Sequence, residues 1–176
     1  MTFPELANKR ESCRSYDSTR VVEQEKIETI ISVARLSPSA CNSQPYHVTV
    51  ATGDAVKEIG KACMGMGMNP FMKDVPVIMI ISERDYNKTA AFGAKIKHND
   101  YRSIDIGILA ANITLAAADL DLGSCIVGWF DNKKICEILS SDVTARLVIA
   151  IGYPKEEKPP RDKKRKDQSE LFSEIK

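Results

Sequence analysis

Two arginines and a serine occupy every second position in one short segment near the N-terminus: Arg10, Ser12 and Arg14. In an extended backbone, alternate side chains point to the same side, so all three would lie on one face. Arginine forms bidentate, charge-assisted hydrogen bonds with phosphate, and a serine hydroxyl can donate to a ligand oxygen as well as accept. The segment therefore indicates a face that binds a phosphate and a polar chain, although by itself the same alternation also fits a solvated edge.

A polar loop lies between two prolines, Pro38 and Pro45, and carries Ser39, Asn42 and Gln44. A side-chain amide offers donors on one side and an acceptor on the other. It can therefore match a flat ring whose edge alternates carbonyl oxygens with N–H groups. The loop predicts a binding site for such a ring, and a capped turn after a helix is the alternative interpretation.

The hydrophobic periodicity divides the chain into short helices and strands that must position these two segments. Helical spacing and capping residues predict helices at residues 2–9, 23–37, 55–64 and 103–122, and a further short helix after a cap at Asp131. Apolar runs predict four strands, at His47–Thr52, Val75–Ser82, Ser124–Phe130 and Ala145–Tyr153. The segment 85–101 gives no clear pattern and is a candidate lid or surface segment.

Two of these elements should be buried. The Val75–Ser82 run is apolar at consecutive positions, which is typical of a central strand covered on both faces. The 103–122 helix is apolar around its circumference and ends at a capping glycine, Gly123, so it should be buried inside the monomer or at a subunit interface. Residues 155–176 are poor in apolar side chains and should therefore lie over another surface or stay mobile.

The composition bounds the class of protein. With 176 residues, 43% of them hydrophobic, the chain should form one domain, residues 1–176, around one core. A net charge of +1 disfavours a globally basic nucleic-acid surface, and no run of eighteen apolar residues occurs. The charged first twelve residues lack the apolar stretch of a signal peptide, so we expect a cytoplasmic protein with no nucleic-acid partner and no membrane association. Five cysteines without a CxxC pair, and only two histidines, predict reduced thiols and no metal site.

Four motifs occur in order along the chain. They are Arg-x-Ser-x-Arg-x-Tyr at residues 10–16, Ala-Arg-Leu-Ser-Pro-Ser-Ala-x-Asn-x-Gln-Pro-Tyr at 34–46, Leu-Gly-Ser-Cys-Ile-Val-Gly-Trp-Phe at 122–130 and Ile-Gly-Tyr-Pro at 151–154. In this order and spacing the chain resembles the nitroreductase family over nearly its whole length. The resemblance implies an α+β fold with a central, mostly antiparallel or mixed sheet flanked by helices. It also implies an intertwined homodimer whose C-terminal tail, about residues 155–176, is exchanged onto the partner.

The resemblance further implies a noncovalent FMN cofactor at a site that two subunits share. Arg10, Ser12 and Arg14 of one subunit would hold the phosphate, the ribityl chain and the ring edge, and Lys163 and Arg165 of the tail would complete the phosphate site. The other cofactor-binding residues that it implies are Pro38, Ser39, Ala40, Asn42 and Gln44 from the partner's loop, and Ile126, Val127, Gly128 and Trp129 along the flavin.

The resemblance assigns the chemistry to the flavin and none to a catalytic side chain. NADH or NADPH would deliver hydride to flavin N5 and leave, and a small acceptor such as a nitroaromatic or a quinone would then take electrons in a ping-pong cycle. A backbone N–H near Gly128 would point at N5, because a residue without a Cβ lets the backbone approach a ring closely. Cys41 and Cys125 would be packing thiols near the flavin.

Three other interpretations stay open on the sequence. The same FMN site could serve a specialised reaction, such as dehalogenation or the oxidation of a flavin or an azoline, although the short 85–101 segment favours an open pocket over an elaborate lid. The chain could also bind flavin without turnover. A nucleic-acid binder that uses Arg161–Lys166 is disfavoured, because that basic run has no interleaved aromatic residues and no known recognition module.

Overall fold

The computed structural model describes residues 1–142, 144–156, 159 and 161–175. Its centre is a four-stranded sheet in the order β1-β2-β4-β3, formed by β1 (Tyr46–Ala51), β2 (Val77–Glu83), β4 (Ala145–Gly152) and β3 (Gly123–Val127). All three strand pairs are antiparallel. The chain therefore has the predicted α+β class, and its sheet is antiparallel throughout.

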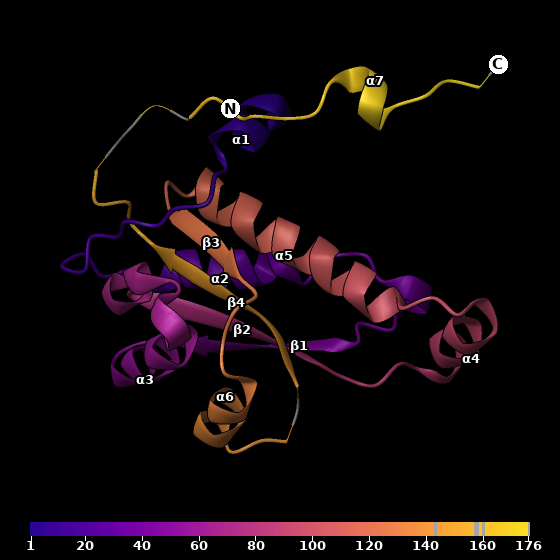
Figure 1. Ribbon diagram of the computed structural model, residues 1–176, viewed down its shortest axis with the longest axis horizontal. Helices are drawn as coiled ribbons and strands as arrows, with labels where there is room; N and C mark the ends of the chain where they lie inside the picture. The colour runs from indigo at the N-terminus through magenta and orange to yellow at the C-terminus, as the bar shows by residue number, and fades with distance from the viewer. Residues whose placement is uncertain (143, 157–158, 160, 176) are drawn as a thin grey trace.

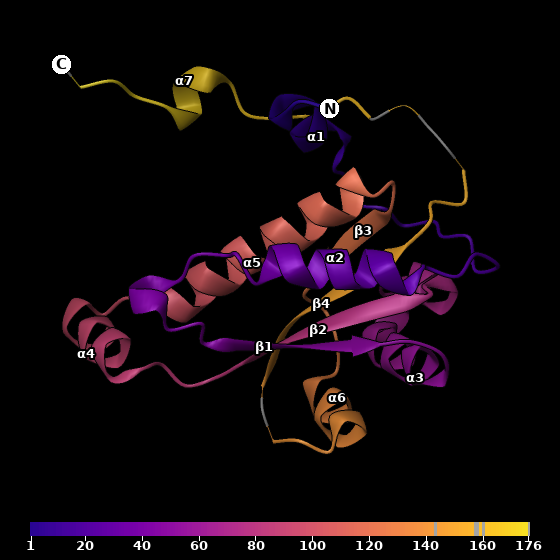
Figure 2. The ribbon, with the colours of Figure 1, turned by 180° about the vertical axis from the view of Figure 1, so that it is seen from behind.

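Helices cover both faces of this sheet. Figures 1 and 2 show α2 (Gln24–Ala34) and α5 (Tyr101–Asp119) on one side of the sheet, and α3 (Asp54–Cys63) and α6 (Asn132–Leu139) on the other. Each helical layer forms its own hydrophobic cluster with the sheet. The arrangement is a three-layer sandwich in which the sheet is the shared middle layer.

Strand β2 has the central position that its sequence predicts. Six of its seven residues are buried, and it pairs with β1 on one side and β4 on the other. Val77, Met79 and Ile81 enter the cluster beneath α2 and α5, whereas Ile78 and Ile80 enter the cluster beneath α3 and α6. A strand that is apolar at consecutive positions is needed here because both of its faces are covered.

Helix α5 is buried on one side only within the chain. Its inward residues, among them Ile106, Leu109 and Ile113, are almost inaccessible. Its outward side chains are also apolar, and Ile104 is 50% exposed. The expected burial therefore holds inside the chain for the inward side of the helix, and the outward side is left uncovered by the described residues.

Two predicted boundaries are wrong by three residues. Helix α2 ends at Ala34 rather than at Ser37, because tighter backbone hydrogen bonds from Leu36 to Val33 and from Ser37 to Ala34 turn the chain before Pro38. Strand β3 ends at Val127 rather than at Phe130. Beyond Val127 the backbone leaves the sheet, and the carbonyl of Trp129 accepts a hydrogen bond from the Asn69 side chain instead.

The segment without a clear pattern contains helix α4 (Lys88–Lys97). Asn87 caps its start by accepting a hydrogen bond from the Ala90 N–H, and His98 ends it in a left-handed conformation with φ of 48°. Ala90 is its one buried residue, so the helix lacks the apolar stripe that sequence analysis depends on. Asn87 also donates to Cys41 O and to Ser43 Oγ, which fixes α4 to the polar loop.

The two ends of the chain lie together, on the side of the sheet that carries α5. Helix α1 (Phe3–Lys9) sits beyond the C-terminal end of α5, and the tail passes α1 and leads to the short helix α7 (Gln168–Leu171), away from the body (Figures 1 and 2). The tail is exposed through its last described residues, and Phe172 is 70% exposed. Within the described residues, no helix is long and apolar enough to cross a membrane.

Candidate functional site

The segment that carries Arg10, Ser12 and Arg14 lies against strand β3. Ser12 forms an isolated parallel bridge with Ser124, and the Cys13 N–H donates to Ser124 O over 2.9 Å. At Gly123, a Cβ would stand 2.7 Å from the Cys13 Cβ, which is too close for any residue with a side chain. Glycine at position 123 thus allows the N-terminal segment to lie on the sheet edge.

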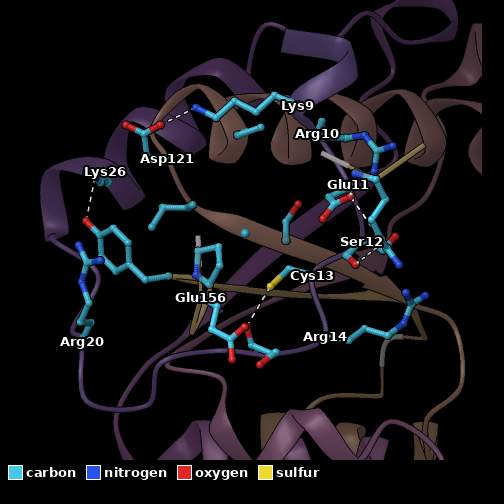
Figure 3. A pocket seen from close by; sticks show the side chains of 18 residues that line it. Lys9, Arg10, Glu11, Ser12, Cys13, Arg14, Arg20, Lys26, Asp121 and Glu156 are labelled. Atoms are coloured by element: carbon cyan, nitrogen blue, oxygen red, sulfur yellow. Dashed lines mark hydrogen bonds and ion pairs between the residues drawn. The ribbon is translucent and has the colours of Figure 1, made fainter. Parts of the chain in front are cut away.

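A cavity of about 990 Å³ opens beside this segment. Figure 3 shows Arg10, Ser12 and Arg14 along one side of the cavity and Arg20 and Lys26 on the opposite side. Six basic side chains line it, against three acidic ones, so its net charge is positive. The lining residues of these two kinds are Lys9, Arg10, Arg14, Arg20, Lys26 and Arg161, and Glu11, Asp121 and Glu156.

Four of these six cations already have partners, and one of them, Arg161, pairs with Glu11 at 3.1 Å. Lys9 pairs with Asp121 at 2.5 Å, and Lys26 donates to Tyr153 Oη at 2.8 Å. The Arg20 guanidinium stacks 3.4 Å from the centroid of the Tyr153 ring. Such cations fix the walls of the cavity.

Arg10 and Arg14 differ from these structural cations. In the described part of the chain, neither side chain makes a hydrogen bond or an ion pair. A guanidinium group carries five N–H donors in a fixed planar fork, so both side chains keep their full capacity for an anion.

A second cavity, of about 370 Å³, joins the N-terminal segment to the tail. It is lined by Arg10, Ser12 and Arg14, which were predicted to hold the phosphate, the ribityl chain and the ring edge, and by Lys163 and Arg165, which were predicted to complete the phosphate site. The structure therefore brings together residues that are separated by about 150 positions in the sequence. The Lys163 ammonium also donates to the carbonyls of Ala7 and Asn8 at the end of α1, which anchors the tail there.

The electrostatics of this second cavity follow from its crowded cations. Partial desolvation, and then repulsion by Arg10 and Arg165, lower the pKa of Lys163. Partial burial raises the pKa of Glu11, but hydrogen bonds from Arg161 outweigh burial and hold that pKa below its ordinary value. An incoming anion would relieve the repulsion among the cations.

The segment Ile126–Trp129 lies at the far end of β3. Ile126 is 44% exposed and Trp129 51% exposed, whereas Val127 is buried. Among the described residues, apart from Gly128 and its two chain neighbours, no atom lies within 4 Å of the position that a Cβ at Gly128 would take, so the space above this backbone is open. The Trp129 indole donates to Gly65 O over 3.3 Å, which ties the segment to the loop before Asn69. Neither of the two cavities is lined by this segment.

The polar loop lies far from the basic cavities within the chain. Its short helix η1 (Ala40–Asn42) follows Ser39, whose hydroxyl accepts from the Gln44 N–H, and Gln44 in turn donates to Asn42 Oδ1. The loop after Pro38 is attached to α5 near its start, because the Ala40 N–H donates to Asp105. The large cavity instead touches α5 at Ala118, and the helix between Asp105 and Ala118 spans about 20 Å at 1.5 Å per residue. The structure does not bring the loop and the basic segment together in one chain.

Sequence reasoning missed two residues that organise these segments. Arg161 lines both cavities and pairs with Glu11, although the sequence suggested it only as part of a basic run. Asn69 joins Cys63 to Trp129 through its side-chain amide. Its signal was weak, since the sequence around it shows only a break in periodicity. Asn69 itself has a left-handed φ of 51°.

The two thiols predicted to pack near the flavin behave differently. Cys125 is buried, and burial raises its pKa. Cys41 is exposed in the polar loop and has a left-handed φ of 50°. Cys125 is therefore packed within the chain and Cys41 is not, and the position of both thiols relative to a flavin stays a prediction.

Comparisons with known proteins define first the fold and then the family. A nitroreductase family protein from Streptococcus pneumoniae superposes with a TM-score of 0.82 at 23% identity, over 99% of this chain and 100% of that chain. An FMN-dependent nitroreductase from Clostridium difficile superposes with a TM-score of 0.72 at 27% identity, over 94% and 92%. The sheet and its two helical layers are thus a nitroreductase fold.

The sequence matches the model of the nitroreductase family over residues 7–67 and 64–153. It is also 24% identical to an oxygen-insensitive NADPH nitroreductase from Helicobacter acinonychis, over 94% of this chain and 93% of that protein. The chain belongs to the nitroreductase family, which is a family of oxidoreductases.

Proposed function

We propose that this protein is an FMN-dependent oxidoreductase that moves hydride from NADH or NADPH to a small acceptor such as a nitroaromatic or a quinone, in a ping-pong cycle. The observation that carries the proposal is the shared cavity of Arg10, Ser12, Arg14, Lys163 and Arg165. The relatives support it, because one solved structure is named an FMN-dependent nitroreductase and one relative an oxygen-insensitive NADPH nitroreductase.

The residues of the second cavity fit the phosphate of FMN. A phosphate monoester carries close to two negative charges at neutral pH, and the unpaired guanidinium groups of Arg10 and Arg14 can each bind it in a bidentate manner. Lys163 adds a point charge beside them, and the Ser12 hydroxyl can donate to a phosphate or ribityl oxygen. These cations repel one another without a ligand, and a bound phosphate would attract each of them and so offset that repulsion.

The open face of Gly128 fits a flat ring. A side chain at this position would meet no protein atom, so the missing Cβ serves no packing purpose inside the chain. It instead leaves room for a ring to approach the backbone N–H closely. When bound there, FMN would supply the redox chemistry at its N5 atom. The chain would orient that ring through Gly128 and exclude water with Trp129, which its bond to Gly65 holds in place.

The homodimer is the second part of the proposal. Five outward residues of α5 form an apolar stripe along one line of the helix, which we call the α5 stripe: Ile104, Gly107, Ile108, Ala111 and Leu115. Apolar side chains at this spacing point to one face and are typical of a helix that packs against another element. A second copy of α5 is the occupant that we propose, because a two-fold axis through the stripe pairs each surface with itself.

Such a dimer would also assemble the flavin site. A two-fold axis that crosses α5 near its middle runs the two helices in opposite directions. It therefore carries the polar loop, which sits near the start of one α5, toward the basic cavities at the end of the other. Pro38, Ser39, Ala40, Asn42 and Gln44 would then reach the partner's flavin.

The tail would extend the exchange between subunits. Residues 161–163 are bound to the same chain's residues 7–12, so only the part beyond them is free to reach the partner. That part carries Leu171, Phe172 and Ile175, all of them exposed in the chain. We propose that these apolar side chains are covered by the partner subunit.

One experiment tests the proposed function. The purified protein should be yellow, should release FMN on denaturation and should oxidise NADH or NADPH when a nitroaromatic, a quinone or free flavin is supplied. Steady-state rates at several acceptor concentrations should give the parallel lines of a ping-pong mechanism. A colourless protein that does not bind added FMN would refute the proposal, and a yellow protein without turnover would leave a flavin-binding protein in its place.

A further inference from the structure

We propose that Glu11 is a positioning residue that fixes the register of the C-terminal tail across the phosphate site. The inference rests on the proposed FMN site, but it concerns a residue that has no direct role in binding an anion. Glu11 stands between Arg10 and Ser12 and lines the second cavity with them. A carboxylate there would weaken phosphate binding, because it repels the anion that its neighbours attract, so Glu11 must have another role.

The reason lies in its bonds to Arg161. One oxygen of Glu11, Oε2, accepts from both the Arg161 backbone N–H at 3.3 Å and its side-chain Nε at 3.1 Å. The Arg161 Nη2 also donates to Ser12 O at 3.3 Å. The bond to the backbone N–H matters most, because it holds the main chain of the tail in place as well as its side chain.

We call the three hydrogen bonds of Arg161 with Glu11 and Ser12 the clamp. The clamp determines which tail residue reaches the end of α1. Two positions beyond Arg161, the Lys163 ammonium donates to the carbonyls of Ala7 and Asn8. A slip that brought Asp162 to those carbonyls would place its carboxylate against other acceptors with no proton to share. A slip in the other direction would bring Lys164 there and move Lys163 away from its observed place. The clamp therefore places Lys163, and after it Arg165, at the cavity that Arg10 and Arg14 line.

An exposed ion pair alone would be too weak for this role. Glu11 is 31% exposed and Arg161 is 64% exposed at the side chain, and such pairs contribute little by themselves. The clamp instead consists of three hydrogen bonds that join the same two short segments, with the Lys163 bonds next to them. Side chains that act together in this way restrain a segment more than a single surface pair does.

The matched control is Asp162. It lines the same cavity with the same charge, and among the described residues its side chain makes no hydrogen bond or ion pair. If carboxylates acted on the phosphate only through their charge, both Glu11→Ala and Asp162→Ala would tighten FMN binding. If Glu11 positions the tail, the two substitutions have opposite or unequal effects.

The experiment compares the wild type with E11A, E11Q and D162A in two measurements. The first is the affinity for FMN and for riboflavin, which has the same ring without the phosphate. We expect E11A to weaken FMN binding about tenfold, the scale of one or two lost hydrogen bonds, and to leave riboflavin binding unchanged. E11Q keeps an acceptor oxygen and should retain most of the FMN affinity, and D162A should bind FMN as the wild type does or more tightly.

The second measurement is the rate of tryptic cleavage after Lys163, Lys164 and Arg165 in the flavin-free protein. It should rise in E11A and not in D162A, because only E11A releases the tail. Tighter FMN binding in both alanine variants would overturn the proposal, as would equal losses in E11Q and E11A. If the wild type binds no FMN, the proposed function fails, and an unchanged cleavage rate in E11A would then overturn the clamp independently.

Discussion

The basic side chains around the large cavity have two roles: some hold the wall together through bonds within the chain, and others have no partner among the described residues and can bind an anion. Arg20 and Lys26 are engaged with Tyr153, so they hold its wall together. Arg10 and Arg14 have no partner in the described part of the chain. A charged group without a partner gains most from an incoming anion, because it gives up no internal bond on binding.

This difference gives a prediction at the scale of single residues. Arg10→Ala and Arg14→Ala should each weaken FMN binding by roughly 1.5–3 kcal/mol, the range for a hydrogen bond to a charged group. Arg20→Ala is the matched control, since Arg20 lines the large cavity but not the second one. Titration of the apoprotein with FMN, followed by flavin fluorescence, measures all three affinities. Equal affinities in the two test variants and the wild type would move the phosphate site elsewhere.

At the scale of one element, strand β3 has a glycine at its start and another just past its end, and the two differ in their surroundings. Gly123, at its start, is needed because Cys13 occupies the place of a side chain. Gly128, just past its end, faces open space. Both glycines lie within one motif, and only the structure separates the packed position of Gly123 from the open position of Gly128, where we propose that the ring binds.

The two glycines should respond in opposite ways to the same change. Gly123→Ala should lower the free energy of unfolding by about 1–3 kcal/mol, because its methyl group overlaps Cys13. Gly128→Ala should leave that free energy nearly unchanged and weaken binding of FMN and riboflavin alike, because a methyl group then separates ring and backbone. Urea unfolding and flavin titration of each variant decide the matter. A stable Gly123→Ala variant, or normal flavin affinity in Gly128→Ala, would contradict the assignment.

Helix α5 gives a second prediction at this scale. Ala111 lies in the middle of the α5 stripe and is exposed in the chain, so Ala111→Asp should not disturb the fold of the subunit. A carboxylate buried without a partner at a dimer interface is strongly unfavourable, so the variant should be monomeric and should lose FMN at the same time. Ala55→Asp is the control, since Ala55 is an exposed helical alanine on the opposite side of the sheet. Sedimentation velocity with flavin detection measures both properties. An Ala111→Asp protein that is dimeric and still binds flavin would show that the α5 stripe is not the dimer interface.

The sequence predicted those parts of the molecule whose signal is local. Strand β2 and helix α5 follow from runs of apolar residues, and the alternation of Arg10, Ser12 and Arg14 indicated side chains that line one cavity. Whether these side chains hold a cofactor stays a prediction. The helix α4 was missed because Ala90 is its one buried residue, and the role of Arg161 was missed because its partner, Glu11, is about 150 positions away. The predicted end of β3 was wrong because the Asn69 side chain, distant in the sequence, takes over the hydrogen bond of the Trp129 carbonyl. The predicted end of α2 was wrong because local backbone hydrogen bonds tighten the chain before Pro38.

At the scale of the whole molecule, the tail links the subunit fold to the proposed site. Residues 161–165 line the second cavity, and the apolar residues beyond them have no cover within the described chain. A segment with too few apolar residues to form its own core gains order only by binding to another surface. The tail should therefore contribute to cofactor binding and to dimer formation through different parts of its length.

Truncation after Pro154 should accordingly weaken both properties together. The shortened protein lacks Lys163 and Arg165 from the phosphate site and Phe172 from the proposed contact with the partner. Sedimentation and FMN titration should show a lower dimer affinity and a lower flavin affinity, with the unfolding of the remaining sheet still cooperative. A second truncation after Asp167 keeps the cavity residues and should restore FMN affinity more than dimer affinity. A shorter protein that stays dimeric and binds FMN normally would show that the tail has neither role.

The pairing of the chain's two ends also determines when the site can form during synthesis. Residues 12–17 bond to Ser124 and to residues 153–155, and residues 7–12 bond to residues 161–163. A ribosome adds residues in order at about 5–20 per second, so the N-terminal segment emerges several seconds before its partners exist. The antiparallel strands β1 and β2 can pair during that time, because both come from the first half of the chain. The proposed phosphate site can therefore close only after residues 161–165 have emerged, so a nascent chain without them lacks part of the site that we propose for the cofactor.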